Sequence, residues 1–176
     1  MRTPASIAGH PIHPMLVTLP IGLWVFSFVC DLIFVFGNGS PAFATVALYT
    51  MAGGIVGALA AAIFGFVDLM SLPPEPRRIA LTHMSINLVV VVLYVINFWL
   101  RSGSPEAPGG YVWLSLIAIG LLVVSGWLGG KMVYLHGVGV GVSGIGDEPR
   151  ATVGDAQRSA AGSAPRGAVG EGSRRA

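Results

Sequence analysis

Four histidines carry the most versatile chemistry in this 176-residue sequence. His10 and His13 stand three residues apart in GHPIHP, each directly before a proline, whereas His83 and His136 lie in distant apolar segments. Imidazole binds zinc, copper, nickel and iron, including haem iron, and it titrates near neutral pH. The histidines therefore indicate a metal ion, a haem or a proton-handling role. Histidines that only hydrogen-bond the backbone are the plainer alternative.

Four other polar residues lie inside or at the ends of apolar runs. They are the carboxylates Asp31 and Asp68 and the amides Asn87 and Asn97. An ionisable residue within a membrane span is a functional candidate by default. We expect Asp68 to orient an imidazole or to ligate a metal, and the asparagines to hydrogen-bond between helices. For Asp31, a functional role and a position near the membrane interface are equally open.

The composition is that of an integral membrane protein. Hydrophobic residues make up 53% of the chain, charged residues only 10%, and the mean hydropathy is +0.74. The nearly uncharged stretches 15–36, about 42–70, 79–100 and 111–130 are each close to or above the roughly 20 residues that cross a bilayer. The sequence therefore predicts an all-α, up-down-up-down, four-helix transmembrane bundle.

The segments outside the bundle differ in composition. We expect residues 1–14 to form a cytoplasmic N-terminal arm and residues 15–136 the transmembrane domain. Residues 137–176 are rich in Gly, Ala, Ser and Pro. Such a segment buries too little apolar surface to fold, which predicts a disordered cytoplasmic tail.

Basic residues in the connections predict the orientation. Those expected on one side are Arg2, Arg77, Arg78, Lys131 and Arg150. The loop at 37–41 has none, and the loop at 101–110 has only Arg101. Since basic loops stay in the cytoplasm, both termini should be cytoplasmic in a cell inner (plasma) membrane.

Helical periodicity groups side chains on two faces. Small residues recur every fourth position in the second span, at Gly53, Gly57, Ala61 and Gly65, and such a stripe lets another helix approach closely. One polar face of the third span carries His83, Asn87, Tyr94, Asn97 and Arg101. Pro20 is expected to kink the first helix, because it cannot donate to the Leu16 carbonyl. No internal repeat is evident.

The orientation places all four histidines and Asp68 at the cytoplasmic boundary. A residue before proline favours an extended backbone, and polyproline helix has three residues per turn. His10 and His13 should therefore face the same way on a stiff arm. The predicted site is a haem b bound by His83 and His136, with His10 or His13 as alternates. A transition-metal ion bound by these four histidines and Asp68 is the alternative.

Several stretches of the chain resemble a known family. GHPIHPMLVTLPIGLW, CDLIF, FGFVDL, THMSIN and GWLGGKMVYLHGVGV, which span about residues 9–141, are similar to the bacterial membrane family called domain of unknown function 2231. The resemblance implies a four-helix membrane fold and brings no established activity. Some relatives look fused to Rieske-type iron–sulfur domains, which implies electron transfer. This chain has no cysteine–histidine cluster after the fourth span, so an iron–sulfur partner would be a separate protein.

Three functions fit the sequence. The leading one is a haem- or metal-binding electron-transfer component of the lipid bilayer. The alternatives are a small proton-coupled transporter, which would need a homo-oligomer for alternating access, and a non-catalytic membrane scaffold. Nucleic-acid binding is not favoured, because no basic cluster is interleaved with aromatics. An enzyme is not favoured either, because nucleophile, phosphate-loop and dinucleotide motifs are missing.

Overall fold

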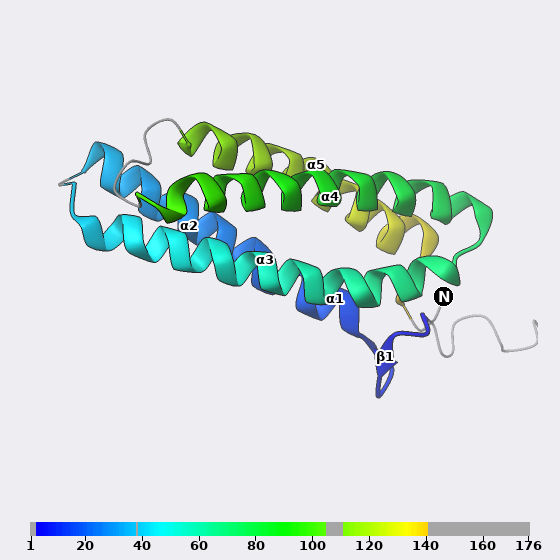
Figure 1. The fold of residues 1–176 in the computed structure, drawn as a ribbon. Helices are drawn as coiled ribbons and strands as arrows, with labels where there is room; N and C mark the ends of the chain where they lie inside the picture. Colours follow the sequence, from blue (N-terminus) through cyan, green and yellow to red (C-terminus); the bar gives the residue numbers. More distant parts are fainter. Residues whose placement is uncertain (1–2, 38, 105–110, 141–176) are drawn as a thin grey trace, which may run out of the picture. The chain divides into compact units, whose positions relative to one another are not determined.

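A computed structural model describes residues 3–37, 39–104 and 111–140. Four long helices dominate it: α2 (Thr18–Phe36), α3 (Pro41–Met70), α4 (Pro74–Ser102) and α5 (Val112–His136) (Figure 1). The short helix α1 (Ile12–Leu16) leads into α2, and a small hairpin of β1 (Ser6–Ile7) and β2 (His10–Pro11) precedes it. The predicted helical membrane bundle is confirmed, with the hairpin as an addition.

The four long helices close into a ring. Each packs against the next along the chain, and α5 also packs against α2, so α2 and α4 lie diagonally across the ring. The N-terminal arm, the α3–α4 connection and the end of α5 share one end of the bundle, which we call the arm end (Figure 1). The α2–α3 connection lies at the opposite end, which we call the far end.

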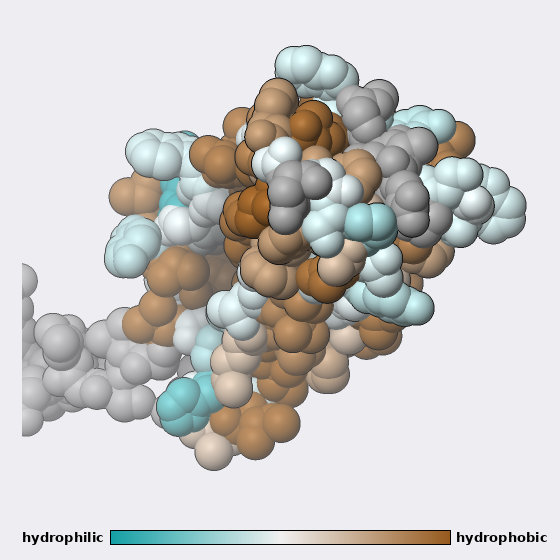
Figure 2. All heavy atoms as spheres, turned by 90° about the vertical axis from the view of Figure 1, so that its left-hand side faces the viewer, coloured by the Kyte–Doolittle hydropathy of each residue, from teal (hydrophilic) through white to brown (hydrophobic). Residues whose placement is uncertain are grey.

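The outer surface of the bundle suits lipid. Four segments are long and apolar enough to cross a membrane: Ile12–Phe36, Pro41–Met70, Pro74–Ser102 and Val112–His136. Apolar side chains, brown in Figure 2, cover much of the helical surface. The side chains of Trp113 and Tyr134 are both exposed on α5. At a helical rise of about 1.5 Å per residue these positions are about 30 Å apart along the helix, and this separation matches the thickness of the hydrocarbon core. Aromatic side chains concentrate at the two membrane interfaces.

Pro20 interrupts the first span, as its position predicts. Residue Val17 separates α1 from α2, although its backbone stays close to helical at φ −64° and ψ −19°. Because Pro20 lacks an N–H, the Leu16 carbonyl loses its usual helical donor. The two helices together still form one stretch that is long and apolar enough to cross a membrane, Ile12–Phe36.

The predicted polyproline arm is wrong. Ala8 and Gly9 adopt positive φ angles of 50° and 81°, which fit a tight hairpin turn, and His10 pairs with Ile7 in an antiparallel ladder. His13 then falls inside α1, where Pro14 is tolerated because a first-turn N–H has no helical partner. His10 and His13 therefore do not lie on one side of a stiff rod.

The small residues of α3 do provide close helix packing. A Cβ on Gly57 would lie 3.0 Å from a Leu19 methyl, and one on Gly53 would lie 3.2 Å from Leu23. A Cβ on Gly54 would collide with the Trp24 indole. The glycine stripe and its neighbour Gly54 therefore let α2 seat directly against the α3 backbone.

Three side-chain pairs cross the centre of the bundle between the diagonal segments. Asp31 forms a bidentate ion pair with Arg101, at 2.7 and 2.8 Å, near the far end. Trp24 stacks on Tyr94 in the middle, with ring centroids 4.2 Å apart. The rings of His13 and His83 face each other toward the arm end, 6.4 Å apart. In every pair the partners are 70 positions apart in the sequence.

The constant offset reveals two equivalent helical hairpins, one made of α1, α2 and α3 and the other of α4 and α5. Buried positions of α2 and α4 correspond at the same offset: Pro20 with Val90, Trp24 with Tyr94, Ser27 with Asn97, Asp31 with Arg101. Those of α3 and α5 correspond at an offset of 64: Met51 with Ser115, Gly54 with Ala118, Ala61 with Ser125. Contacts between equivalent residues are the mark of a two-fold axis. The repeat concerns positions rather than residue types, which is why the sequence does not display it.

The ion pair should tolerate reversal but not truncation. Arg101→Ala leaves the fully buried Asp31 without its partner, and we expect it to cost about 3–5 kcal/mol of stability. The double variant Asp31→Arg/Arg101→Asp should recover most of that loss, because the two positions are equivalent across the axis. Thermal unfolding of the three proteins in detergent measures both effects. A double variant as unstable as Arg101→Ala would contradict the proposed equivalence.

Candidate functional site

Two of the four histidines meet near the arm end of the bundle. The His13 ring reaches across to α3, where its Nδ1 lies 2.8 Å from the Ala61 carbonyl oxygen. The His83 ring reaches across to α5, where its Nδ1 lies 2.9 Å from the Ser125 carbonyl oxygen. Since a carbonyl only accepts, each Nδ1 carries the proton and donates it. In the neutral ring this leaves Nε2 as the basic atom, which is the state in which imidazole binds a metal.

Each imidazole sits beside a glycine one helical turn after its carbonyl acceptor. A Cβ on Gly65 would lie 2.8 Å from the His13 Nδ1 atom, and one on Gly129 would lie 3.5 Å from the His83 Cε1 atom. The two hairpins therefore build the same unit of a histidine, a carbonyl acceptor and a glycine that makes room for the ring. The ring planes are nearly perpendicular, at 87°.

The His83 half of the site has additional polar contacts. The Ser125 hydroxyl lies 2.9 Å from the His83 Nδ1 atom and accepts a 2.6 Å hydrogen bond from the Asn87 amide. The same amide donates to the His83 carbonyl at 2.9 Å. Asn87 therefore forms the interhelical hydrogen bond that the sequence predicts, and it fixes the serine that contacts the imidazole.

The other predicted ligands do not join this pair. His10 is exposed, and its Nδ1 lies 3.1 Å from the nearby Ala8 carbonyl oxygen. His136 ends α5, about 10 Å along the helix beyond Gly129. Asp68 accepts a 2.9 Å hydrogen bond from the Ala5 N–H and so anchors the arm. Within residues 3–37, 39–104 and 111–140, no three His, Cys, Asp or Glu side chains are grouped to hold a metal. The structure brings His83 next to His13, which the sequence predicted as an alternate ligand, whereas His136 lies at the end of α5.

The polar residues near the far end have structural partners. Both carboxylate oxygens of Asp31 accept from Arg101, and the Asn97 amide donates to the Ser115 hydroxyl at 2.9 Å. Arg101 lies within α4 and is fully buried, which agrees with the polar face predicted for the third span and not with its place in the predicted loop at 101–110. The sequence held a signal for this pair, because charges inside a membrane usually pair with one another.

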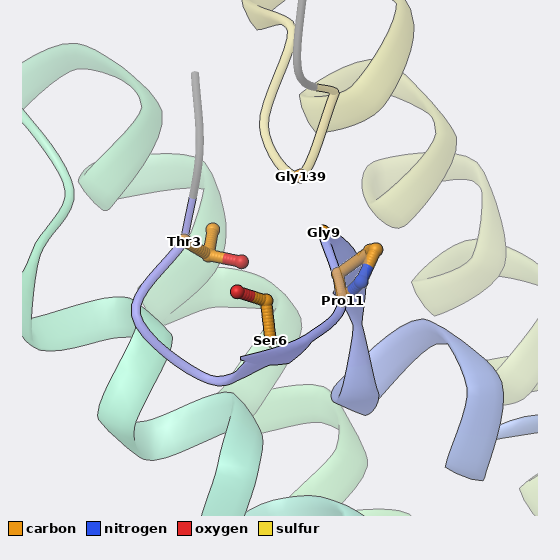
Figure 3. A pocket seen from close by; sticks show the side chains of 5 residues that line it. All are labelled: Thr3, Ser6, Gly9, Pro11 and Gly139. Atoms are coloured by element: carbon orange, nitrogen blue, oxygen red, sulfur yellow. The ribbon is translucent and has the colours of Figure 1, made fainter.

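The two most specific sequence motifs meet at the arm end. Gly139, in the GVGV stretch after α5, has φ +78°, and a Cβ there would lie 3.4 Å from Pro11 of the HPIHP motif. Figure 3 shows Thr3 and Ser6 beside this contact, with their hydroxyls directed toward each other. Val138 packs against the buried cluster of Leu69 and Leu72. The segment predicted as a tail thus begins with ordered residues, and its remainder, 141–176, lies outside the described residues.

The fold and the site define a four-helix integral membrane protein with a cross-bundle pair of imidazoles. The sequence profile of the family described as "Predicted membrane protein (DUF2231)" matches residues 9–142. The chain therefore belongs to this family. Comparisons with curated proteins and with solved structures found no match.

Gly65 should be sensitive to a single added methyl group. Gly65→Ala places a Cβ against the His13 ring, so the ring must move or the helices must separate, and we expect a loss of about 1–3 kcal/mol. Gly126→Ala is the matched control, because a Cβ at Gly126 meets nothing within 4 Å. Thermal unfolding in detergent compares the two variants. Equal stability of both would show that the ring does not occupy the position described.

Proposed function

We propose that the protein is a membrane electron-transfer component that binds a redox-active iron, as haem b, between His13 and His83. The observation that carries the proposal is the pair of opposed imidazoles, each fixed through Nδ1 by a backbone carbonyl of the neighbouring helix. A metal-binding histidine typically donates its other ring N–H to such an acceptor, which sets the tautomer and the ring orientation.

The donor set fits haem iron better than a bare ion. Haem would supply nitrogen ligands of its own, so His13 and His83 would be the residues of this chain that hold its iron. A structural zinc ion usually takes four protein ligands, and within the described residues only His13 and His83 face each other. The ring centroids of His13 and His83 are 6.4 Å apart.

The chain's own residues would position and insulate the group. Ala61 and Ser125 hold the rings through their carbonyls, and Gly65 and Gly129 leave room beside them. Bound haem would supply reversible one-electron chemistry at its iron. On the side toward the far end, the stacked Trp24 and Tyr94 form an apolar layer across the bundle.

The transporter alternative draws less support from the contacts. Its motivating residues were Asp31, Asn87 and Asn97 together with the broken first helix. Both oxygens of Asp31 are occupied by Arg101, and both asparagine amides donate to serines of α5. Contacts of this kind stabilise the bundle, and they engage both oxygens of Asp31 and the amide N–H groups of Asn87 and Asn97.

The site would face the cytoplasm. Arg77, Arg78 and Lys131 are exposed near the arm end. With Arg101 buried in α4, the sequence between 103 and 111 contains no basic residue. The positive-inside rule then orients the arm end toward the cytoplasm in the inner membrane. A separate redox protein, such as an iron–sulfur protein, would exchange electrons at this face.

The visible spectrum tests the proposal. The protein purified in detergent should show a Soret band that shifts on reduction with dithionite, and one iron per chain. His13→Ala and His83→Ala should each reduce the bound haem at least tenfold, because each removes one of the two imidazoles that would hold the iron. His10→Ala and His136→Ala are matched controls and should retain it, since neither side chain joins the pair.

The outcomes discriminate among the three functions. Protein expressed with ample haem that shows neither haem nor stoichiometric metal would overturn the proposal. A scaffold would give no cofactor and would tolerate all four histidine variants in the cell. A transporter would show flux in proteoliposomes that does not depend on His13 or His83.

Labelling of introduced cysteines tests the orientation. In a Cys30→Ala background, Glu75→Cys should react with a membrane-impermeant maleimide only after the membrane is opened, since the arm end is cytoplasmic. Ser104→Cys, exposed near the far end, should react in intact cells. The reverse pattern would place the imidazole pair near the outer surface and refute the assigned orientation.

A further inference from the structure

Three buried polar atoms of α4 have no hydrogen-bond partner within the described part of the chain. They are the Tyr94 hydroxyl oxygen, the Asn97 carbonyl oxygen Oδ1 and the Arg101 Nε atom. All three side chains are fully buried. A buried polar group without a partner costs about 1–3 kcal/mol, and native proteins usually satisfy such groups with protein atoms or internal water.

These residues border one region of the bundle interior. Positions 94, 97 and 101 follow helical spacing, so they lie on one face of α4, within about 10 Å along the helix. Tyr94 stacks on Trp24, and Arg101 donates two hydrogen bonds to Asp31 across the ring of helices. The three residues therefore line one stretch of the bundle interior, which runs from the aromatic pair to the ion pair.

The chemistry of the three atoms selects the ligand. Arg101 Nε–H can only donate, Asn97 Oδ1 can only accept, and the Tyr94 hydroxyl can do both. A matching ligand must both accept and donate. It must also be neutral, because the Asp31–Arg101 pair already balances its own charges. Water meets these requirements, and buried waters typically make about three hydrogen bonds.

We propose that the bundle holds an internal water site, bounded by Tyr94, Asn97 and Arg101, between its aromatic pair and its ion pair. Water there accepts from the arginine Nε–H and the tyrosine hydroxyl and donates to Asn97 Oδ1. The site extends the hydrogen bonding of the ion pair to the middle of the membrane, where it ends at the aromatic layer. It requires no cofactor at the histidines, so its test is independent of the proposed function.

Radiolytic hydroxyl labelling of the purified protein detects the site directly. Radicals formed from internal water modify adjacent side chains even when these are shielded from bulk solvent. Tyr94 should be modified, whereas Met51, equally inaccessible and packed in the same apolar cluster, should not. An unmodified Tyr94 in the intact protein overturns the proposal, whatever the variants show.

The variant Tyr94→Phe provides a second test, because the direction of its change in Tm distinguishes a hydrated region from a dry one. If water satisfies the hydroxyl, its removal should lower Tm by about 2–4 °C, as expected for one lost hydrogen bond. If the region is dry, removal of an unsatisfied buried hydroxyl should raise Tm. Tyr49→Phe is the control, because that ring is exposed on α3. A Tm that is unchanged or higher contradicts the water site, and a variant that fails to fold leaves the labelling result to decide.

Discussion

The bidentate contact between Asp31 and Arg101 fixes the register on which the rest of the bundle depends. Both side chains are fully buried between helices that hydrocarbon surrounds, where an isolated charge is costly. Their two parallel hydrogen bonds demand a defined separation and rotation of α2 and α4. Because helices are stiff, this one contact also sets Trp24 against Tyr94 and brings His13 opposite His83, each at the same offset of 70 residues.

The two equivalent hairpins explain which residues can face each other on the axis. In a symmetric arrangement each axial residue would meet its own copy, and two carboxylates or two guanidinium groups would repel. The residues at positions 31 and 101 are of opposite charge, which turns that repulsion into an ion pair. Histidine is compatible with itself, since a neutral imidazole carries both a donor and a basic nitrogen. Among the three pairs that cross the bundle, the one formed by His13 and His83 is therefore the one that retains identical residues.

The helices and their main faces were predictable from local patterns, whereas the partners across the bundle were not. The length of the apolar stretches predicted the four spans, and Pro20 predicted the irregularity in the first of them. The small-residue stripe predicted the close contact between α3 and α2. The pairing of Asp31 with Arg101 depends on the register of two diagonal helices, which no local spacing encodes. The arm was mispredicted because the proline preferences at His10 and His13 were weighed without the turn at Ala8 and Gly9. His136 was preferred to His13 because the basic residues predicted the side of the membrane on which each histidine lies, whereas nothing in the sequence predicted the depth of each histidine along the bundle.

The close approach of the imidazoles of His13 and His83 is the central claim, and magic-angle-spinning NMR measures it most directly. In a His10→Ala/His136→Ala protein with labelled histidine, only these two rings give signals. The account predicts through-space cross-peaks between the rings, consistent with centroids 6.4 Å apart. Two ring signals with no cross-peak, at mixing times that detect other contacts of this length, would contradict it.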